Sequence, residues 1–403
     1  MPPKILALVS AAALFSTHFL GAQAPPSADL IRDVAASPFT LVARADGSVV
    51  GLGYDPSELG VKTVPTVIDL PGKALRVAVG DNTNTAYVLL EDGTVVAWGA
   101  NDEGQLGNGP SGATGVLGIN TKRSATPVKV TGLADIINIE AGRKHAVALR
   151  KDGTVWAWGT RDDGALGGGD AKPARSPGVV PAYAPVAVPG LEGITQIAVG
   201  LRHNLALRRD GHVLAWGANG AGELGNGTRA TGWTPTEVTG LDRVVAIAAG
   251  FGAAHGVSGA VRDDGTVWMW GSNESAMMGN DQGATAPDDP GGRNLLPAQV
   301  KGIAGAKALS IGAGHVAALL GDGTLRMWGH NGYGEMGIGT SGVYEPKPVK
   351  VTALTSVAAV YLGSMRSYAV RADGTFWCWG FGNYRLKGAL SKDLHVPTLL
   401  DLR

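Results

Sequence analysis

Asp-Gly pairs that precede an alternating apolar segment recur seven times along this chain of 403 residues. They begin at Asp46, Asp92, Asp152, Asp210, Asp264, Asp322 and Asp373. The mean spacing, about 54 residues, is too long for ankyrin, tetratricopeptide or leucine-rich repeats and suits one blade of a β-propeller. We therefore expect seven repeats arranged in a ring.

One complete repeat contains four short segments rich in β-branched and aromatic residues, at 127–130, 136–141, 145–149 and 154–158. Such segments are typical of strands. Asp152-Gly153 lies between the last two and predicts a two-residue hairpin turn in which both central residues have positive φ. The repeat therefore predicts a four-stranded antiparallel blade with its strands in this order.

The last strand of this repeat has apolar residues on both faces. Alternation places Val155 and Ala157 on one face and Trp156 and Trp158 on the other. A sheet with two apolar faces must be covered on both sides, which a ring of stacked blades achieves. With 62 glycines, 44% hydrophobic and 17% charged residues, the composition also favours a globular all-β fold with many tight turns.

Charge and cysteine content exclude several classes of partner and site. Lys plus Arg and Asp plus Glu number 34 each, without a basic cluster, so we expect no nucleic-acid partner. Cys378 is the only cysteine, which excludes an intramolecular disulfide and a thiolate metal cluster. It occupies a position held by Ala157 and Ala215 in other repeats, so we interpret it as a buried packing residue.

The first 24 residues are typical of a secretory signal peptide. Lys4 precedes an apolar run over 5–15, and Ala22-Gln23-Ala24 is a small-x-small cleavage site. The run is too short for a stable membrane anchor. We therefore expect residues 1–24 to be removed, and residues 25–403 to form a single propeller that is secreted or periplasmic and not inserted in a membrane.

Three motifs together resemble the regulator of chromosome condensation (RCC1) repeat. They are Gly142-x-x-His145-x-x-Ala148-Leu149, Asp152-Gly153-Thr154-Val155-Trp156-Ala157-Trp158-Gly159 and Asn101-x-x-Gly104-Gln105-Leu106-Gly107-Asn108-Gly109. The resemblance covers essentially all of the chain after the signal segment and implies a seven-bladed propeller that binds proteins. The family's best-known activity is nucleotide exchange on small GTPases. We do not expect that activity here, because a signal peptide removes the protein from cytosolic GTPases.

The two ends of the repeat array differ from the other copies. The first copy lacks the opening Pro-x-x-Val strand, whereas 397–402 supplies such a strand after the last copy. We therefore expect the C-terminal strand to close the ring by completing the sheet of the first blade.

Histidines and paired carboxylates are the residues that could carry chemistry. His145, His203 and His315 recur seven residues before Asp-Gly, and His255 is offset by two residues. Equivalent positions on different blades lie far apart, so we interpret these histidines as structural, bonded to backbone near the central shaft. The pairs Asp102-Glu103 and Asp162-Asp163 occupy the same turn of successive repeats. They could suggest a glycosidase, but the turn is Gly220-Ala221 in the next repeat, which favours a solvated surface.

Motifs of known enzymes give no support to catalysis. The chain has no nucleophile elbow, zinc-protease motif, phosphate loop or EF-hand loop, and Gly332–Gly337 matches a dinucleotide fingerprint without opening a helix. We expect a monomeric, non-enzymatic protein-interaction module without metal or cofactor, which could act as an inhibitor of an exported enzyme in the way of the β-lactamase-inhibiting propeller. The alternative is a propeller that binds or cleaves carbohydrate or cell wall, which would need clustered carboxylates and exposed aromatics.

Three insertions indicate where a partner binds. Residues 110–126, 168–184 and 280–296 occupy the same place in their repeats, so we expect them to emerge on one side of the ring. Aromatic and arginine side chains are common anchors of protein interfaces. The candidate partner-binding residues are Lys122, Arg123, Lys172, Arg175, Tyr183, Asp288, Asp289 and Arg293, with Trp233 in the corresponding short loop. The alternative is that the insertions are loops without a role.

Overall fold

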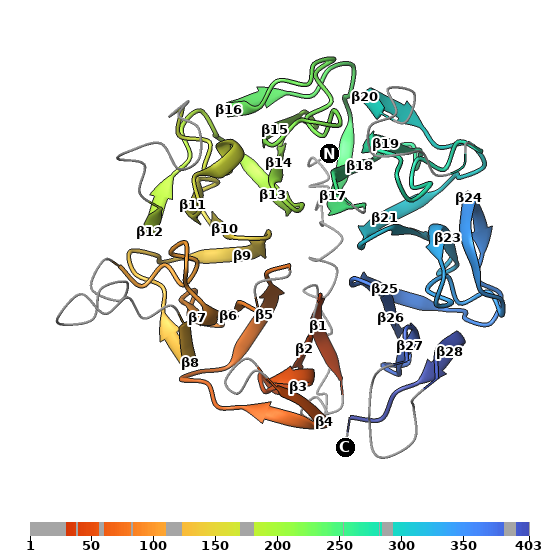
Figure 1. Ribbon diagram of the computed structural model, residues 1–403, viewed down its shortest axis with the longest axis horizontal. Helices are drawn as coiled ribbons and strands as arrows, with labels where there is room; N and C mark the ends of the chain where they lie inside the picture. The colour runs from red at the N-terminus through yellow and green to blue at the C-terminus, as the bar shows by residue number, and fades with distance from the viewer. Residues whose placement is uncertain are drawn as a thin grey trace, which may run out of the picture.

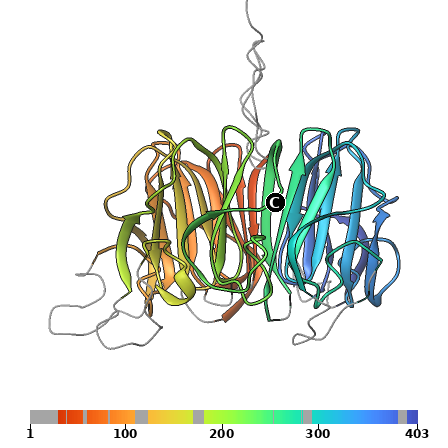
Figure 2. The same ribbon diagram turned by 90° about the horizontal axis from the view of Figure 1, so that it is seen from above.

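Seven four-stranded antiparallel sheets form a ring around a central shaft (Figure 1), which confirms the predicted propeller. The computed structural model describes residues 30–37, 39–55, 60–81, 84–109, 123–169, 181–252, 254–281, 283, 293–382 and 392–402. The predicted signal segment at 1–24 lies outside these residues. In Figure 2 the ring is a thick disc, and the strands run between its two flat faces.

The first four blades follow one another along the chain. Blade 1 contains β1 (Ile31–Ala36), β2 (Thr40–Arg44), β3 (Val49–Asp55) and β4 (Gly60–Ile68). Blade 2 contains β5 (Ala74–Val79), β6 (Ala86–Leu90), β7 (Val95–Ala100) and β8 (Arg123–Lys129). Blade 3 contains β9 (Ile136–Ala141), β10 (His145–Arg150), β11 (Val155–Gly159) and β12 (Ala182–Ala187). Blade 4 contains β13 (Ile194–Val199), β14 (His203–Arg208), β15 (Val213–Gly217) and β16 (Gly232–Glu237).

The last three blades complete the ring. Blade 5 contains β17 (Val244–Phe251), β18 (Gly256–Arg262), β19 (Val267–Ser272) and β20 (Arg293–Gln299). Blade 6 contains β21 (Ala306–Ile311), β22 (His315–Leu320), β23 (Leu325–Asn331) and β24 (Gly342–Lys350). Blade 7 contains β25 (Val357–Leu362), β26 (Arg366–Arg371), β27 (Phe376–Gly380) and β28 (Leu394–Leu399). The one helical turn among the described residues is the 3-10 turn η1 (Asp162–Gly164).

The predicted order of strands within a blade is wrong by one strand. The Pro-x-x-Val segment at 127–130 was expected to open the blade that contains β9, but it lies in β8, which pairs with β7 of the preceding blade. Ala97 opposes Val128, and Val130 N donates to Val95 O (2.9 Å). The short link at 130–135 therefore crosses between blades, whereas the long segment between β7 and β8 joins two paired strands.

The predicted closure of the ring is also wrong. β28 pairs with β27 of blade 7, and blade 1 supplies its own fourth strand, β4, which contains Pro65. The ring closes by side-chain packing between blades 1 and 7, where Val42 and Leu52 share an apolar cluster with Phe376 and Leu400. A hydrogen bond from Arg44 Nη2 to Leu402 O (2.8 Å) adds one contact from the C-terminal segment to blade 1.

Deletion of residues 396–403 should lower the free energy of unfolding by about 2 to 3 kcal/mol. The deletion removes most of β28, exposes the edge of β27, and removes the buried Leu400 side chain from the seam between blades 1 and 7. Urea unfolding followed by circular dichroism measures the loss, and a chain ending at Leu400 is the control. An unchanged midpoint for the longer deletion would contradict the contribution of β28.

The Asp-Gly turns are three-residue hairpin loops, not the expected two-residue turns. Gly153 N donates to Arg150 O (2.9 Å), and of the Asp152-Gly153 pair only the glycine has a positive φ, of 86°. This is a type I turn followed by a glycine in the left-handed region. Asp152 Oδ1 accepts hydrogen bonds from Thr154 Oγ1 (2.6 Å) and Thr154 N (2.9 Å), which hold the pKa of this carboxyl below its ordinary value. The aspartate therefore fixes the turn through its side chain.

The core lies between the blades, as the two apolar faces predict. Trp158 is fully buried and contacts Tyr87 of blade 2 edge-on, with ring centroids 6.0 Å apart. Trp156, on the other face of β11, is half-buried beneath Arg150, whose guanidinium lies 4.6 Å from the ring centroid. Cys378 is buried in β27, which confirms its interpretation as a packing residue.

Candidate interaction face

The two flat faces of the disc carry different connections. The first and third strands of a blade run in the same direction, so the turn after the first strand and the loop after the third lie on one face, here called the loop face. The Asp-Gly hairpins and the links between blades lie on the opposite face, here called the hairpin face. Each predicted insertion joins the third and fourth strands of its blade, so its described ends lie on the loop face.

A buried asparagine shapes the loop that follows the third strand in four blades. Its Oδ1 atom accepts a hydrogen bond from the backbone N–H five residues later, at 3.0 to 3.1 Å. The four asparagines are Asn101, Asn219, Asn273 and Asn331. A side-chain acceptor of this kind replaces the strand hydrogen bonds that the turn loses. The Asn-x-x-Gly-x-Leu-Gly pattern therefore indicates a turn that its own asparagine side chain stabilises.

Each of these turns is also anchored to the next blade by a buried tryptophan. The indole Nε1 atom donates to a backbone carbonyl of the preceding blade's turn at 2.6 to 3.1 Å. The five pairs are Trp158 with Gln105, Trp216 with Ala165, Trp270 with Glu223, Trp328 with Met277, and Trp379 with Glu335. Tryptophan N–H groups need such partners when buried. Five turns of the loop face are therefore held in place by hydrogen bonds from the neighbouring blades.

Three of the recurring histidines belong to the same inter-blade network. His203 Nε2 lies 2.9 Å from Ser258 Oγ of the next blade, and that hydroxyl donates to Glu223 O (2.8 Å). His145 and Asn204 form an equivalent pair at 2.8 Å. His315 and Ser367 form a third pair at 3.0 Å. The structural interpretation is confirmed, but the ring partner is a side chain of the neighbouring blade and not backbone.

Burial keeps these three imidazoles neutral. Desolvation lowers the pKa of His145 to about 4, although the hydrogen bond with Asn204 partly opposes it. Desolvation lowers the pKa of His203 to about 3 and that of His315 to about 4. Because the serine hydroxyls and the asparagine amide already donate to carbonyls, Nε2 of each ring carries the proton.

Ion pairs join neighbouring blades at the rim of the loop face. Glu103 of blade 2 pairs with Lys144 of blade 3 at 3.2 Å, and Asp163 of blade 3 pairs with Arg202 of blade 4 at 3.0 Å. Asp102 is exposed, and Glu103, Asp162 and Asp163 are half-exposed. The acidic pairs therefore lie on the solvated surface, as expected, but the sequence did not reveal their cationic partners.

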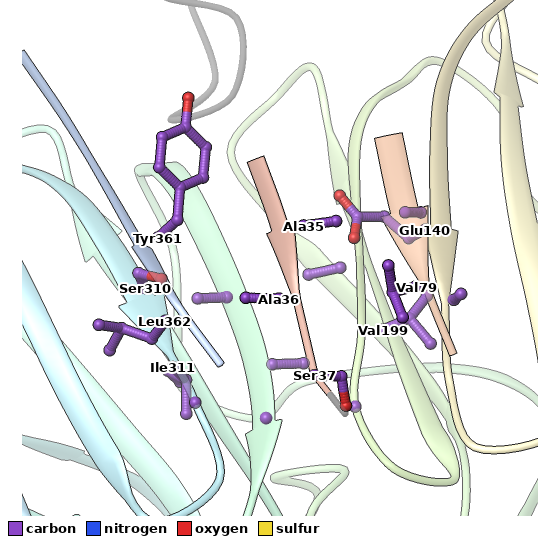
Figure 3. A pocket seen from close by; sticks show the side chains of 18 of the residues that line it. Ala35, Ala36, Ser37, Val79, Glu140, Val199, Ser310, Ile311, Tyr361 and Leu362 are labelled. Atoms are coloured by element: carbon purple, nitrogen blue, oxygen red, sulfur yellow. The ribbon is translucent and has the colours of Figure 1, made fainter. Parts of the chain in front are cut away.

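The central shaft contains a polar cluster that the sequence reading missed. The shaft holds a cavity of about 240 Å³, and Glu140 and Tyr361 extend into it from opposite sides (Figure 3). Desolvation raises the pKa of Glu140 to about 7, the nearby Asp33 carboxylate adds to this rise, and Arg76 opposes it. Desolvation also raises the pKa of Asp33, again opposed by Arg76. These four side chains form one electrostatically linked group.

A signal for two members of this cluster, Asp33 and Arg76, exists in the repeats. The third residue of the innermost strand is polar in blades 1 to 4 and alanine in blades 5 to 7. In order, these residues are Asp33, Arg76, Asn138, Gln196, Ala246, Ala308 and Ala359. Some of the polar ones join blades, because Asp33 Oδ2 accepts from Val77 N (3.0 Å) and Gln196 Nε2 donates to Ile247 O (3.0 Å).

The described residues contain no group of three or more His, Cys, Asp or Glu side chains that could hold a metal ion. Burial raises the pKa of the Cys378 thiol to about 12, which disfavours the reactive thiolate. Among the residues that the structure describes, no helix is long and apolar enough to cross a membrane.

Comparison with known protein families supports the resemblance that the sequence motifs indicated. Two models of the regulator of chromosome condensation (RCC1) repeat match the chain, one at 92–149, 152–207 and 210–253, the other at 76–105, 136–164, 194–223 and 306–335. The chain belongs to the RCC1 repeat family. The matched segments lie in blades 2 to 6, and the first and last blades carry the most altered copies.

Relatives of this RCC1 propeller include parts of much larger proteins. The chain is 26% identical over 359 residues to the E3 ubiquitin-protein ligase HERC2 of Homo sapiens, covering 85% of the chain but only 7% of that protein. It is 29% identical over 413 residues to Protein pim1 of Schizosaccharomyces pombe, covering 93% of the chain and 73% of that protein. Among solved structures, Prp20p from Saccharomyces cerevisiae matches with a TM-score of 0.69 and 23% identity, covering 87% of this chain and 82% of that one. This last likeness shows the fold alone.

The structure describes four of the nine candidate partner-binding residues and does not bring the group together as a whole. Tyr183 of β12 packs on the Gly104 turn of blade 2, and Trp233 of β16 packs on the Gly164 turn of blade 3, so both also support the ring. Arg123 is half-exposed at the start of β8. Arg293 begins β20, and the remaining candidates, Lys122, Lys172, Arg175, Asp288 and Asp289, lie outside the described residues.

Proposed function

We propose that this RCC1 propeller is a non-enzymatic protein-interaction module that acts outside the cytoplasm and binds its partner on the loop face. The observation that carries the proposal is the anchoring of five loop-face turns to neighbouring blades by buried tryptophans. A surface held in this way loses little conformational entropy when a partner binds. Loops on rigid scaffolds are common binding elements.

The position of the insertions supports the same face. The described ends of the three insertions are Gly109 and Arg123, Gly169 and Pro181, and Gly283 and Arg293. All three pairs join the third and fourth strands of a blade, so these described ends share one face of the ring. The partner is proposed to contact these ends together with the turns, and the basic, aromatic and acidic residues of the insertions are the candidates for that contact.

Export rests on the pattern of the first 24 residues, in which Lys4 precedes an apolar run and a small-x-small site. An exported propeller does not meet cytosolic GTPases, so the partner is sought among periplasmic and secreted proteins. An exported enzyme that the propeller inhibits is one such partner.

Trimming all three insertions should abolish partner capture and change the free energy of unfolding by less than about 1 kcal/mol, because loop closure depends weakly on loop length. Each segment between its described ends is shortened to the length of residues 226–231, the blade 4 loop. The tagged mature chain is used to capture proteins from periplasmic and culture fractions, with mass spectrometry as the readout.

The matched control is Lys151→Glu, an exposed charge reversal on the hairpin face, which should leave capture unchanged. Retained capture with all three insertions trimmed would contradict the loop-face proposal. A tagged chain found in the cytoplasm at full length would contradict export.

A further inference from the structure

A cavity of about 200 Å³ opens on the loop face between blades 4 and 5. Its existence follows from small residues at positions that carry charges elsewhere in the ring. The acidic pairs Asp102-Glu103 and Asp162-Asp163 are replaced by Gly220-Ala221 in blade 4. The position of the cation that pairs with them, Lys144 or Arg202, is taken by Gly256 in blade 5. The inter-blade ion pair is therefore missing where the cavity opens.

The first hairpin of blade 5 is longer than its equivalents and brings His255 to the cavity. β17 continues to Phe251, and the turn closes through a hydrogen bond from Gly252 N to His255 O (2.7 Å). The buried position that His203 occupies in blade 4 is taken by Val257, which opposes Gly271 as His203 opposes Gly217. The two-residue offset of His255 seen in the sequence therefore moves this ring from the core to the cavity wall.

The carboxylates beside the cavity already have hydrogen-bond donors. Glu223 Oε1 accepts from Gly256 N (3.1 Å), and Glu223 Oε2 accepts from Ala221 N (2.8 Å). Glu274 accepts from His255 Nδ1 (2.5 Å) and from Ala254 N (2.7 Å). Burial alone would raise the pKa of Glu274, but these hydrogen bonds outweigh it and hold the pKa below its ordinary value. Both acids are buried, so the protein itself compensates their charge.

The donors that line the cavity are not all used. Arg229 donates from Nε to Gly220 O (2.8 Å), and among the described residues its two terminal nitrogens have no acceptor. Arg202 uses Nη1 on Asp163 (3.0 Å), which leaves Nη2 available. The Thr231 hydroxyl likewise has no partner in the described part of the chain. The cavity thus has unused donors, whereas the buried carboxylates of Glu223 and Glu274 already accept hydrogen bonds from the protein.

We propose that this cavity binds a carboxylate of the protein partner, a proposal that rests on the proposed function. An arginine with two free terminal nitrogens forms strong, paired hydrogen bonds with a carboxylate. A monoanion suits the cavity better than a phosphate dianion, because Asp163 and Glu223 line it and like charges oppose a second negative charge. The carboxylate belongs to an Asp or Glu side chain or to a chain terminus.

The sharpest test fills the cavity with a carboxylate from the chain itself. Gly220 has an ordinary φ, and a Cβ atom there would lie 3.5 Å from His255 Cδ2, in normal van der Waals contact. Gly220→Asp restores the residue that blades 2 and 3 carry at this position, Asp102 and Asp162. Its carboxylate should occupy the donors and exclude an external one. Gly220→Asn has nearly the same size without the charge and is the matched control.

Binding is measured by NMR titration of the propeller with three probes. They are a capped, amidated peptide with one glutamate, an acetylated peptide whose only carboxylate is its C-terminus, and inorganic phosphate. We expect one of the two carboxylate probes to bind. Gly220→Asp and Arg229→Ala should each weaken that binding at least about tenfold, the order of a charge-assisted hydrogen bond. Gly220→Asn and Lys144→Ala should stay within about twofold of the unmodified protein.

The proposal is overturned if neither carboxylate probe binds, if Gly220→Asp binds as well as Gly220→Asn, or if phosphate binds more tightly than both peptides. Failure of the untrimmed chain to capture any partner overturns the proposed function, whereas the titration reports on the cavity without a partner. The two failures are therefore distinguishable.

Discussion

Lowering the pH from 7.5 to 5 should reduce the free energy of unfolding of this propeller by about 4 kcal/mol, because its buried histidines cannot take up protons. The folded pKa of His145, His203 and His315 is about 4, about 3 and about 4. In the unfolded chain, histidine titrates at about 6.5. The folded pKa is depressed, so the stability is fully present above 6.5 and is lost as the pH falls toward 4. Each histidine accounts for about 2 kcal/mol at pH 5.

Glu140 opposes this trend. Its folded pKa, about 7, lies above its unfolded value, so protons bind the folded state more tightly between these two values. The folded state therefore gains stability from Glu140 as the pH falls. Glu140 is half-buried at the shaft, and water there limits its contribution to about 2 kcal/mol. Subtracting this from the histidine contribution leaves the net loss of about 4 kcal/mol.

The low pKa of two of these histidines has a structural cause, because one nitrogen of each ring lacks a hydrogen-bond partner. The Nδ1 atoms of His145 and His315 are buried and have no hydrogen-bond partner among the described residues. A proton at Nδ1 would create a buried, unpaired cation, which is more costly than a neutral unpaired acceptor.

Two variants separate these contributions in urea unfolding at pH 5 and pH 7.5. His203→Gln keeps a side-chain donor toward Ser258 but does not titrate, so its loss between the two pH values should be about 2 kcal/mol smaller. Glu140→Gln removes the opposing effect and should make the loss about 2 kcal/mol larger. Equal pH dependence in His203→Gln and the unmodified protein would show that the buried imidazoles do not control acid stability.

The repeats allowed the fold to be predicted because local and long-range signals agree. The seven Asp-Gly pairs, the alternating strands and the paired tryptophans all indicate one kind of blade, and the structure contains seven of them. What the repeats do not define is where one blade ends. The Pro-x-x-Val strand lies between a long loop and a short link, and sequence separation wrongly favoured pairing across the short link. The expected closure by residues 397–402 failed for the same reason.

The candidate site was less predictable, because its features depend on contacts between repeats. The ion pair of Glu103 with Lys144 joins residues in different blades, and neither residue type is informative alone. The shaft cluster arises from the third and fifth positions of innermost strands in different blades, such as Asp33 and Glu140. The histidines were recognised as structural, but their partners, Asn204, Ser258 and Ser367, are ordinary polar residues until the blades are stacked.

The glycine that follows the last tryptophan of blades 2 to 7 should be the least replaceable residue of the repeat. Gly159 follows Trp158 with a φ of 101°, and a Cβ atom there would lie 2.3 Å from Lys144 O and 2.9 Å from His145 Cα. Gly159→Ala therefore combines a left-handed backbone with a clash against main-chain atoms that cannot move without shifting β10. The expected loss is about 3 to 5 kcal/mol in the free energy of unfolding.

The matched control is Gly190→Ala, which isolates the backbone term. Gly190 has a φ of 74°, but nothing lies within 4 Å of a Cβ atom at that position, so only the conformational cost of about 1 to 2 kcal/mol should appear. Urea unfolding of both variants gives the difference between strain alone and strain with a clash. Equal losses would mean that the close approach of β11 to the turn before β10 does not explain why tryptophan is followed by glycine in these repeats.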